Sequence, residues 1–203
     1  MQKPIFELEG LVDILDVDQS IRIDLKYATS QNFTRLKLYA FPLGLLRYEM
    51  AKNLAKASFL AQREGFFLKI WDAYRPVSVQ KFFHDITPED QRKYIPSVEK
   101  SVHPRGIAVD LTLTDIHGKE LDMPTEFDDF STRAHANSTE ATPTQIENRE
   151  RLREIMKNSG FEMSPVEWWH FNGAPLEKYS IIDLDFNDFV QQRKIAVDNL
   201  GLF

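Results

Sequence analysis

The sequence predicts an α+β fold in a single domain spanning residues 1–203. Segments typical of strands and helices are mixed along the chain, without the regular alternation of a doubly wound sheet. No repeat, low-complexity tract or linker rich in proline, glycine or serine divides the chain. With 203 residues, of which 42% are hydrophobic and 28% charged, the chain can bury one large core.

Three elements are predicted in the first half. IRIDLKYA (21–28) alternates apolar and polar residues, as a half-buried strand does. Residues 45–63 carry apolar side chains at helical spacing, and Gly65 is placed to end that helix. FFLKIWDAYR (66–75) is strand-like, and Pro76 either stops this strand or opens the next helix.

The second half begins with the clearest strand, 106–114, followed by a turn at DIHGK. Residues 122–142 have turn chemistry and little periodicity, which predicts a functional or covering loop. A short strand is predicted at 166–171, and the tail from Asp183 is typical of a helix.

One helix has clear signals at both ends. Thr142 and Pro143 are typical of a cap and a first helical position, and the helix is predicted to end before Gly160. Its buried stripe is predicted to consist of Ile146, Leu152, Ile155 and Met156.

Composition excludes several classes of partner and site. The net charge of −6, without a basic block, argues against binding to nucleic acid. The absence of cysteine excludes disulfides and thiolate metal sites, so a metal would be held by histidine and carboxylate. MQKPIFELEG lacks the apolar region of a secretory signal, and no run is long enough to cross a bilayer. We therefore expect a cytoplasmic protein with no membrane partner.

The 106–114 strand carries a single carboxylate, Asp110. Its alternation places Ile107, Val109, Leu111 and Leu113 on one face, which is core. Gly106, Ala108, Asp110 and Thr112 share the other face, where small residues would leave space above the carboxylate. A carboxylate buried there needs a partner.

His103 is a candidate partner for Asp110, seven positions earlier. In a continuous strand this odd separation would put the two side chains on opposite faces. Pro104 and Gly106 interrupt the regular path, so a turn can bring His103 back over the Asp110 face.

Glu167 and His170, in VEWWHF, raise the same question because residues three apart in a strand point to opposite sides. Pro165 indicates that Glu167 lies at an irregular strand entry, so the two could converge between Trp168 and Trp169. With His103 and Asp110 this makes two histidines and two carboxylates. A hydrolytic zinc site needs three protein ligands and a separate carboxylate as general base. Spacing alone leaves open which carboxylate is the ligand.

Structural interpretations compete with this one. A histidine beside aromatics is usually packed or on the surface, and paired tryptophans are usually core. Arg75, in DAYRP, is most simply paired with a nearby acid such as Asp72. Three other histidines lie in polar surroundings and are predicted to be solvated: His84, His117 and His135. No HExxH, Walker, dinucleotide or G-x-S-x-G pattern is present.

Two motifs together resemble a known family. The pattern S-x-H-x-x-G-x-A-x-D is met in SVHPRGIAVD (101–110), and E-x-W-H follows at 167–170. Both are similar to motifs of the zinc D-Ala-D-Ala dipeptidases, the VanX-type enzymes of vancomycin resistance, which are related to D,D-carboxypeptidases and the Hedgehog N-terminal fold. The similarity covers most of residues 24–171, through DLKYATSQNFT, DAYRP, DLTL, FDDF and NRERLREIMKNSGFEMSPVEWWHF.

The resemblance implies a central, mostly antiparallel sheet with flanking helices, and one zinc ion per chain. It makes His103, Asp110 and His170 the zinc ligands, Glu167 the general base and Arg75 the group that stabilises the oxyanion. It also implies a substrate-binding role for three further residues: Tyr27, Ser101 and Asp128.

The activity implied is hydrolysis of the dipeptide D-Ala-D-Ala to two D-alanines. The stretch between Arg75 and Ser101 is shorter than in the vancomycin-resistance enzymes, which leaves the strictness for D-Ala-D-Ala open. One rival is a D,D-carboxypeptidase acting on longer cell-wall peptides, which the missing export signal disfavours. Another is a zinc-stabilised binding module without turnover, which would need neither Glu167 nor Arg75. The sequence leaves oligomeric state and physiological role open.

Overall fold

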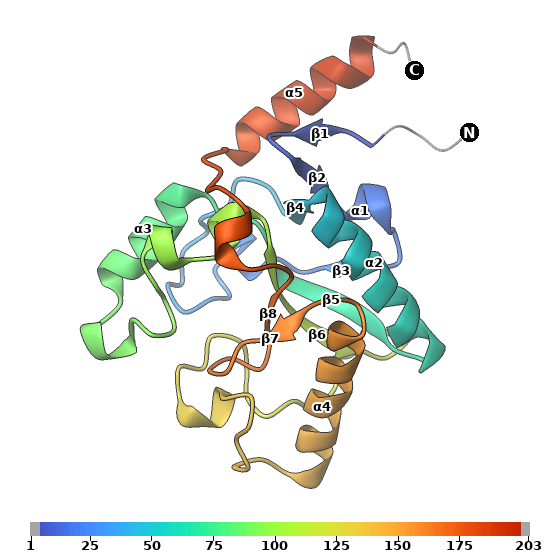
Figure 1. Ribbon diagram of the computed structural model, residues 1–203, viewed down its shortest axis with the longest axis vertical. Helices are drawn as coiled ribbons and strands as arrows, with labels where there is room; N and C mark the ends of the chain where they lie inside the picture. The colour runs from blue at the N-terminus through green and yellow to red at the C-terminus, as the bar shows by residue number, and fades with distance from the viewer. Residues whose placement is uncertain (1–4, 200–203) are drawn as a thin grey trace.

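The computed structural model describes residues 5–199 and contains two β-sheets (Figure 1). The smaller sheet is antiparallel, in the order β1 (Glu7–Leu8), β2 (Leu11–Asp13) and β4 (Leu45–Arg47). The central sheet has the order β3 (Arg22–Ile23), β5 (Phe67–Asp72), β6 (Ala108–Thr114), β8 (His170–Asn172) and β7 (Glu162–Met163). Only the pairing of β3 with β5 is parallel, which confirms the predicted α+β fold with a mostly antiparallel sheet.

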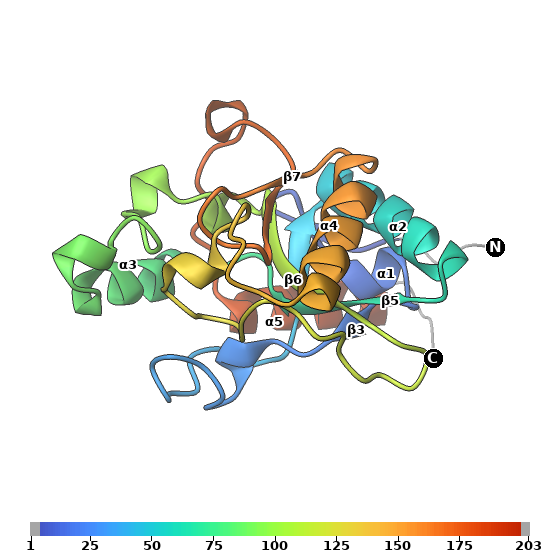
Figure 2. The same cartoon turned by 90° about the horizontal axis from the view of Figure 1, so that it is seen from below.

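Five α-helices surround these sheets within residues 5–199: α1 (Ile14–Val17), α2 (Tyr48–Arg63), α3 (Val77–Ile86), α4 (Pro143–Lys157) and α5 (Phe186–Asn199). α2 and α4 lie side by side, with α2 packed on β5 and α4 on β7 (Figures 1 and 2). α3 lies apart from them, at the left of both views. None of these helices is both long and apolar enough to cross a membrane.

The helix ends agree with the signals in the sequence. The Thr142 hydroxyl accepts from the Gln145 backbone and the Gln145 side chain accepts from the Thr142 backbone, a complete capping box for α4. Gly65, with φ of +84°, follows the end of α2, as predicted. In the predicted stripe of α4, Leu152, Ile155 and Met156 are buried and Ile146 is half-buried.

Several predicted elements were longer than the observed ones, including the strands predicted at 66–75 and 106–114. The strand at 21–28 is limited to Arg22–Ile23, because the chain turns at Lys26–Ala28 and buries Tyr27. The helix predicted from residue 45 begins at Tyr48, because Leu45–Arg47 pairs with β2. For residues 45–47, pairing with a strand more than thirty residues earlier in the sequence therefore outweighed the local helical periodicity.

A β-bulge in β5 shapes the face of the sheet that carries the site. Regular alternation would place Asp72 on the face of Leu68 and Ile70, which lie opposite the core residues of β6. The register shifts between Ile70 and Asp72, so Asp72 lies opposite Asp110 instead. On this face of β6, Asp110 lines a cavity, whereas Ala108 and Thr112 are fully buried and do not line it.

Candidate active site

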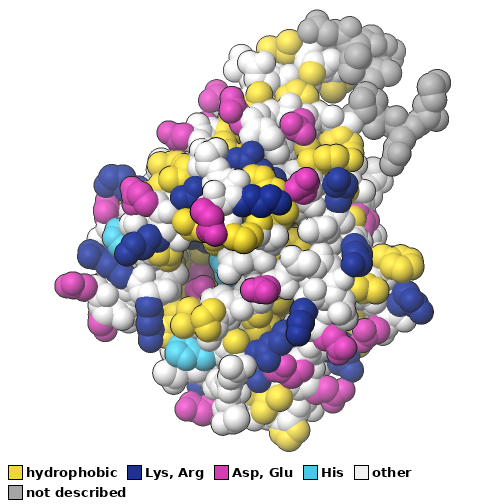
Figure 3. All heavy atoms as spheres, viewed as in Figure 1, with side chains coloured by type: hydrophobic (Ala, Val, Ile, Leu, Met, Phe, Trp, Pro, Cys, Tyr) yellow, Lys and Arg dark blue, Asp and Glu magenta, His cyan; other side chains and the backbone are white. Residues whose placement is uncertain are grey.

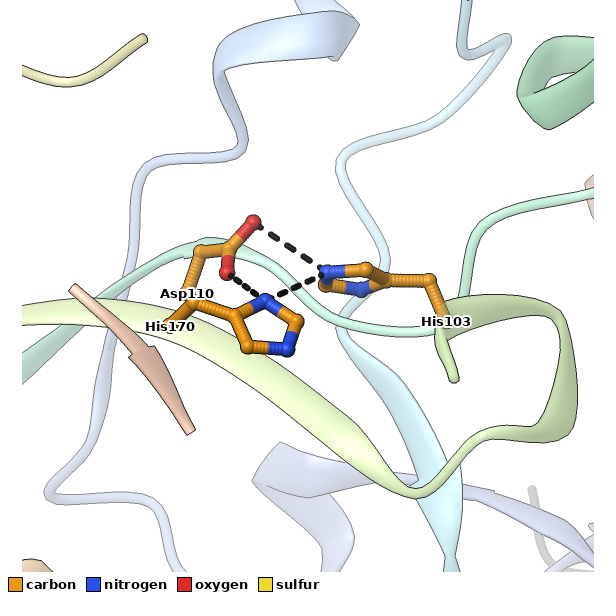
Figure 4. A group of neighbouring side chains, drawn as sticks. All are labelled: His103, Asp110 and His170. Atoms are coloured by element: carbon orange, nitrogen blue, oxygen red, sulfur yellow. Dashed lines mark hydrogen bonds and ion pairs between the residues drawn. The ribbon is translucent and has the colours of Figure 1, made fainter. Parts of the chain in front are cut away.

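Three side chains from separate segments meet at one point (Figure 4). Asp110 of β6 and His170 of β8 are cross-strand neighbours, and His170 Nδ1 lies 2.9 Å from Asp110 Oδ1. His103 begins a short 3₁₀ turn that ends at Gly106, whose φ of +67° reverses the chain. This turn places His103 Nε2 3.4 Å from Asp110 Oδ2 and 3.2 Å from His170 Nδ1.

The outer nitrogen of each imidazole has its own partner. His103 Nδ1 lies 2.7 Å from the Ala73 carbonyl oxygen, and His170 Nε2 lies 3.0 Å from Asn172 Oδ1. Because both partners are acceptors, these outer nitrogens carry the protons of neutral rings. The inner nitrogens then present lone pairs toward each other and toward the Asp110 carboxylate. Because these lone pairs repel one another in a buried site, a bound cation would stabilise the arrangement.

The dimensions of this cluster fit zinc. A tetrahedral ion with bonds of about 2.0–2.1 Å separates its ligand atoms by roughly 3.3 Å. The three inner separations of 2.9, 3.2 and 3.4 Å are close to that value. All three residues are buried, and two histidines with one carboxylate form a donor set typical of catalytic zinc sites.

The electrostatics of the cluster favour an ionised Asp110. Burial acts to raise the pKa of Asp110, but the charges and hydrogen bonds of His103 and His170 outweigh it and hold that pKa well below its usual range. Burial acts to lower the pKa of His170, and Asp110 more than offsets this effect, so the pKa of His170 is raised. Without a cation, a proton on an inner imidazole nitrogen would serve the ionised Asp110, and a bound metal would take the place of that proton.

Glu167 lies in the turn between β7 and β8. The turn is closed by hydrogen bonds from the Ser164 N–H to the His170 carbonyl (2.8 Å) and from the His170 N–H to the Glu167 carbonyl (3.3 Å). The strand predicted at 166–171 therefore starts only at His170, and Glu167 lies at an irregular entry, as expected. Burial raises the pKa of Glu167 to about 8, and Asp110 adds to that rise.

The two tryptophans of VEWWHF are both buried and belong to an aromatic wall. Trp168 packs edge-on against Trp71 and Trp169, with ring centroids 5.7 and 5.4 Å apart. Trp169 also faces the cavity that contains Glu167. The aromatic core therefore forms part of the wall of the candidate site.

Arg75 is held by hydrogen bonds at all three of its nitrogens and lies beside two aromatic rings. Its Nε and Nη2 donate to Asp72 Oδ2 at 2.9 and 2.7 Å, and its Nη1 donates to Gln80 Oε1 at 2.9 Å. The guanidinium carbon lies 5.2 Å from the ring centroid of Tyr27 and 5.0 Å from that of Phe83. The predicted ion pair with Asp72 is confirmed, and it is buried.

A guanidinium carries five N–H donors. The contacts with Asp72 and Gln80 use three of those of Arg75. Its remaining two, one on each terminal nitrogen, can therefore serve the cavity that Arg75 lines.

Asp128 lines the same cavity as Arg75. It adopts the left-handed backbone conformation, with φ of +61°, and accepts a hydrogen bond from the Tyr27 hydroxyl at 2.9 Å. Burial raises the pKa of Asp128 to about 7, although the bond from Tyr27 opposes the rise. Such a conformation is uncommon for a residue other than glycine and clusters at functional sites.

All of the predicted site residues line one cavity of about 190 Å³: Tyr27, Arg75, Ser101, His103, Asp110, Asp128, Glu167 and His170. Figure 3 shows a hollow left of its centre with acidic and histidine side chains inside. The volume lies below the range of about 300–1,000 Å³ typical of sites for drug-sized ligands. The cavity therefore suits a small ligand.

Sequence reasoning missed part of this cavity. Tyr94, Ile95 and Pro96 form a wall that no motif indicated. His84 and His135 were predicted to be solvated, which is wrong: both are half-buried and hydrogen-bonded to the wall. The hydrogen bonds of His84 and His135 to the wall join residues that are not neighbours in the sequence, so the polarity of the surrounding sequence could not indicate these bonds.

Comparisons with known proteins agree on one family. The model of the peptidase M15 family, described as D-Ala-D-Ala dipeptidase, matches residues 7–191. The D-alanyl-D-alanine dipeptidase of Escherichia coli is 37% identical over 181 residues, covering 89% of this chain and 93% of that protein. The D-alanyl-D-alanine dipeptidase of Enterococcus faecium is 35% identical over 182 residues, covering 80% and 90%.

A solved structure gives a weaker match. The vancomycin resistance D,D-pentapeptidase VanY, in complex with Zn(II), is 17% identical with a TM-score of 0.43, covering 66% of this chain and 75% of that one. Similarity at this level is too low to inform on the site.

Proposed function

The chain belongs to the D-Ala-D-Ala dipeptidase family of M15 peptidases, and from this premise we propose that it hydrolyses D-Ala-D-Ala with one bound zinc ion. The main support for the proposal is that the possible metal ligands His103, Asp110 and His170 lie together in one cavity. Glu167 and Arg75 line the same cavity. His103 Nε2, His170 Nδ1 and an Asp110 oxygen would hold the ion.

Bound zinc would supply Lewis acidity and lower the pKa of a water molecule. Glu167 takes the proton from the attacking water, and it then passes that proton to the leaving amine. Its raised pKa supports this role, because a desolvated carboxylate is the stronger base.

Arg75 stabilises the negative charge that develops on the carbonyl oxygen of the substrate. Contacts with Asp72, Gln80 and two aromatic rings hold the guanidinium in place, so little reorganisation is needed when the charge forms. Its two remaining N–H groups are the donors for that oxygen.

A free dipeptide at neutral pH carries one ammonium and one carboxylate group. Asp128, oriented by Tyr27, supplies an acidic partner suited to the ammonium. Ser101, almost fully buried in the cavity wall, offers a hydroxyl for the polar groups of the substrate. A cytoplasmic location is part of the proposal, and cell fractionation would test it.

Purified enzyme with zinc is expected to hydrolyse D-Ala-D-Ala rapidly and L-Ala-L-Ala poorly. It should also act slowly on a pentapeptide ending in D-Ala-D-Ala, because the cavity of about 190 Å³ is small. Release of D-alanine, measured with and without zinc, checks both expectations. Faster cleavage of the pentapeptide would indicate a D,D-carboxypeptidase, and no hydrolysis of any of these peptides would refute the proposal.

Protein purified without a chelator is expected to contain one zinc per chain, since the two histidines and Asp110 form a single three-ligand cluster. Elemental analysis measures the stoichiometry. His117→Ala is a matched control that should keep the metal, because His117 is exposed in the turn after β6. A stoichiometry near zero, with no activity recovered on adding zinc, would contradict the assignment.

A further inference from the structure

One wall of the cavity is attached to α3 by two side chains. The wall includes Tyr94, Ile95 and Pro96, which all line the cavity. Gln80 Nε2 donates to the Pro96 carbonyl oxygen at 2.7 Å, and His84 Nδ1 lies 2.9 Å from the Ile95 carbonyl oxygen. These two contacts anchor neighbouring residues of the same wall.

Gln80 makes a second contact that His84 lacks. The Gln80 side chain is fully buried, and its Oε1 accepts the hydrogen bond from Arg75 Nη1 at 2.9 Å. The Arg75 guanidinium can only donate hydrogen bonds and the Pro96 carbonyl can only accept them. The Gln80 side-chain amide therefore satisfies both groups only when its oxygen faces Arg75 and its nitrogen faces Pro96. Gln80 therefore connects the wall of the cavity directly to the guanidinium.

The ion pair with Asp72 leaves one motion of Arg75 free. Both of its hydrogen bonds to Asp72 end on the same oxygen, Oδ2, because Oδ1 accepts from the Tyr39 hydroxyl at 2.8 Å. Contact with a single atom lets the guanidinium pivot in its own plane about that atom. The rings of Tyr27 and Phe83, whose centroids are 4.7 Å apart, lie together on one side of the guanidinium, and neither ring accepts or donates a hydrogen bond that would stop this rotation.

We propose that Gln80 is a positioning residue, which stops the in-plane rotation of Arg75 and aims its two free N–H groups at the reacting carbonyl. The inference rests on the proposed function, in which Arg75 meets the developing oxyanion. Because the same amide holds Pro96, the position of Arg75 is linked to the position of the cavity wall.

Three variants separate this role from simple support of the wall. Gln80→Met removes both contacts at similar size and should lower kcat by about tenfold to a hundredfold, as a small misplacement of a catalytic group does. Gln80→Glu keeps an acceptor for Arg75 and should restore most of kcat. His84→Leu, the matched control, removes only the neighbouring wall anchor, so it should raise KM with kcat close to that of the wild type.

Steady-state kinetics on D-Ala-D-Ala, with folding checked by circular dichroism, gives the result. In an Arg75→Lys background, Gln80→Met should lower kcat much less than in the wild type, because the group it positions has gone. Equal kcat losses in Gln80→Met and His84→Leu, or no rescue by Gln80→Glu, would overturn the inference while the wild-type enzyme remains active. An inactive wild type would instead refute the proposed function, and this inference with it.

Discussion

Glu167→Gln is expected to keep one zinc per chain and to lower kcat by a factor of about 10²–10⁴, the range for loss of a general base. Glutamine has nearly the same size and shape but cannot take a proton from water. Glu167 lies outside the cluster of His103, Asp110 and His170, so its replacement should leave the ligands in place. Steady-state kinetics and elemental analysis of the same preparation measure both quantities.

Two comparisons make this test specific. Glu162→Gln, a change of the same kind at an exposed position of β7, should leave both kcat and zinc content unchanged. Asp110→Ala and His170→Ala should lose zinc and activity together, because they remove ligands. If Glu167→Gln emptied the site while Asp110→Ala kept it filled, the roles of the two carboxylates would have to be exchanged.

Much of this site could be predicted because its residues lie in two short motifs. Pro104 and Gly106 indicated a turn that could return His103 to Asp110, and the structure contains that turn. The irregular entry expected near Glu167 is also present. In both places a residue with restricted or unusual backbone freedom marks the break in periodicity, so local sequence carries the signal.

The features of the fold and the site that the sequence did not predict depend on contacts between segments far apart in the chain. Nothing in residues 45–47 indicates that they would pair with β2. The bulge before Asp72 is a matter of register with β6, and it decides whether this carboxylate faces the core or Arg75. Gln80 has no signal of its own, since its role follows from the simultaneous approach of Arg75 and Pro96.

Arg75→Ala is expected to lower kcat by about a hundredfold or more, as loss of one preorganised oxyanion donor does. Arg75→Lys should rescue kcat poorly, because an ammonium on a flexible stem cannot contact Asp72 and Gln80 and still present two donors to the cavity. Steady-state kinetics on D-Ala-D-Ala measures both losses, with zinc content expected to stay at one per chain.

The free energy of unfolding of Arg75→Ala should fall as well, because Arg75 also forms a buried ion pair with Asp72. Asp72 has no exposed surface, and its pair with Arg75 is buried. Removing one partner of a buried pair costs about 3–5 kcal/mol, whereas an exposed pair contributes at most about 1 kcal/mol. Thermal melts should therefore show a lower Tm for Arg75→Ala, and kcat has to be measured well below that temperature.

A second buried arginine separates the two effects. Arg149 has the same exposed fraction as Arg75, 4%, but lies on α4 and donates to the Ser138 carbonyl outside the cavity. Arg149→Lys should lower Tm and leave kcat unchanged, whereas Arg75→Lys should lower both. If the folded Arg75→Lys enzyme kept a nearly normal kcat, the guanidinium would only pair with Asp72, and another group would have to stabilise the oxyanion.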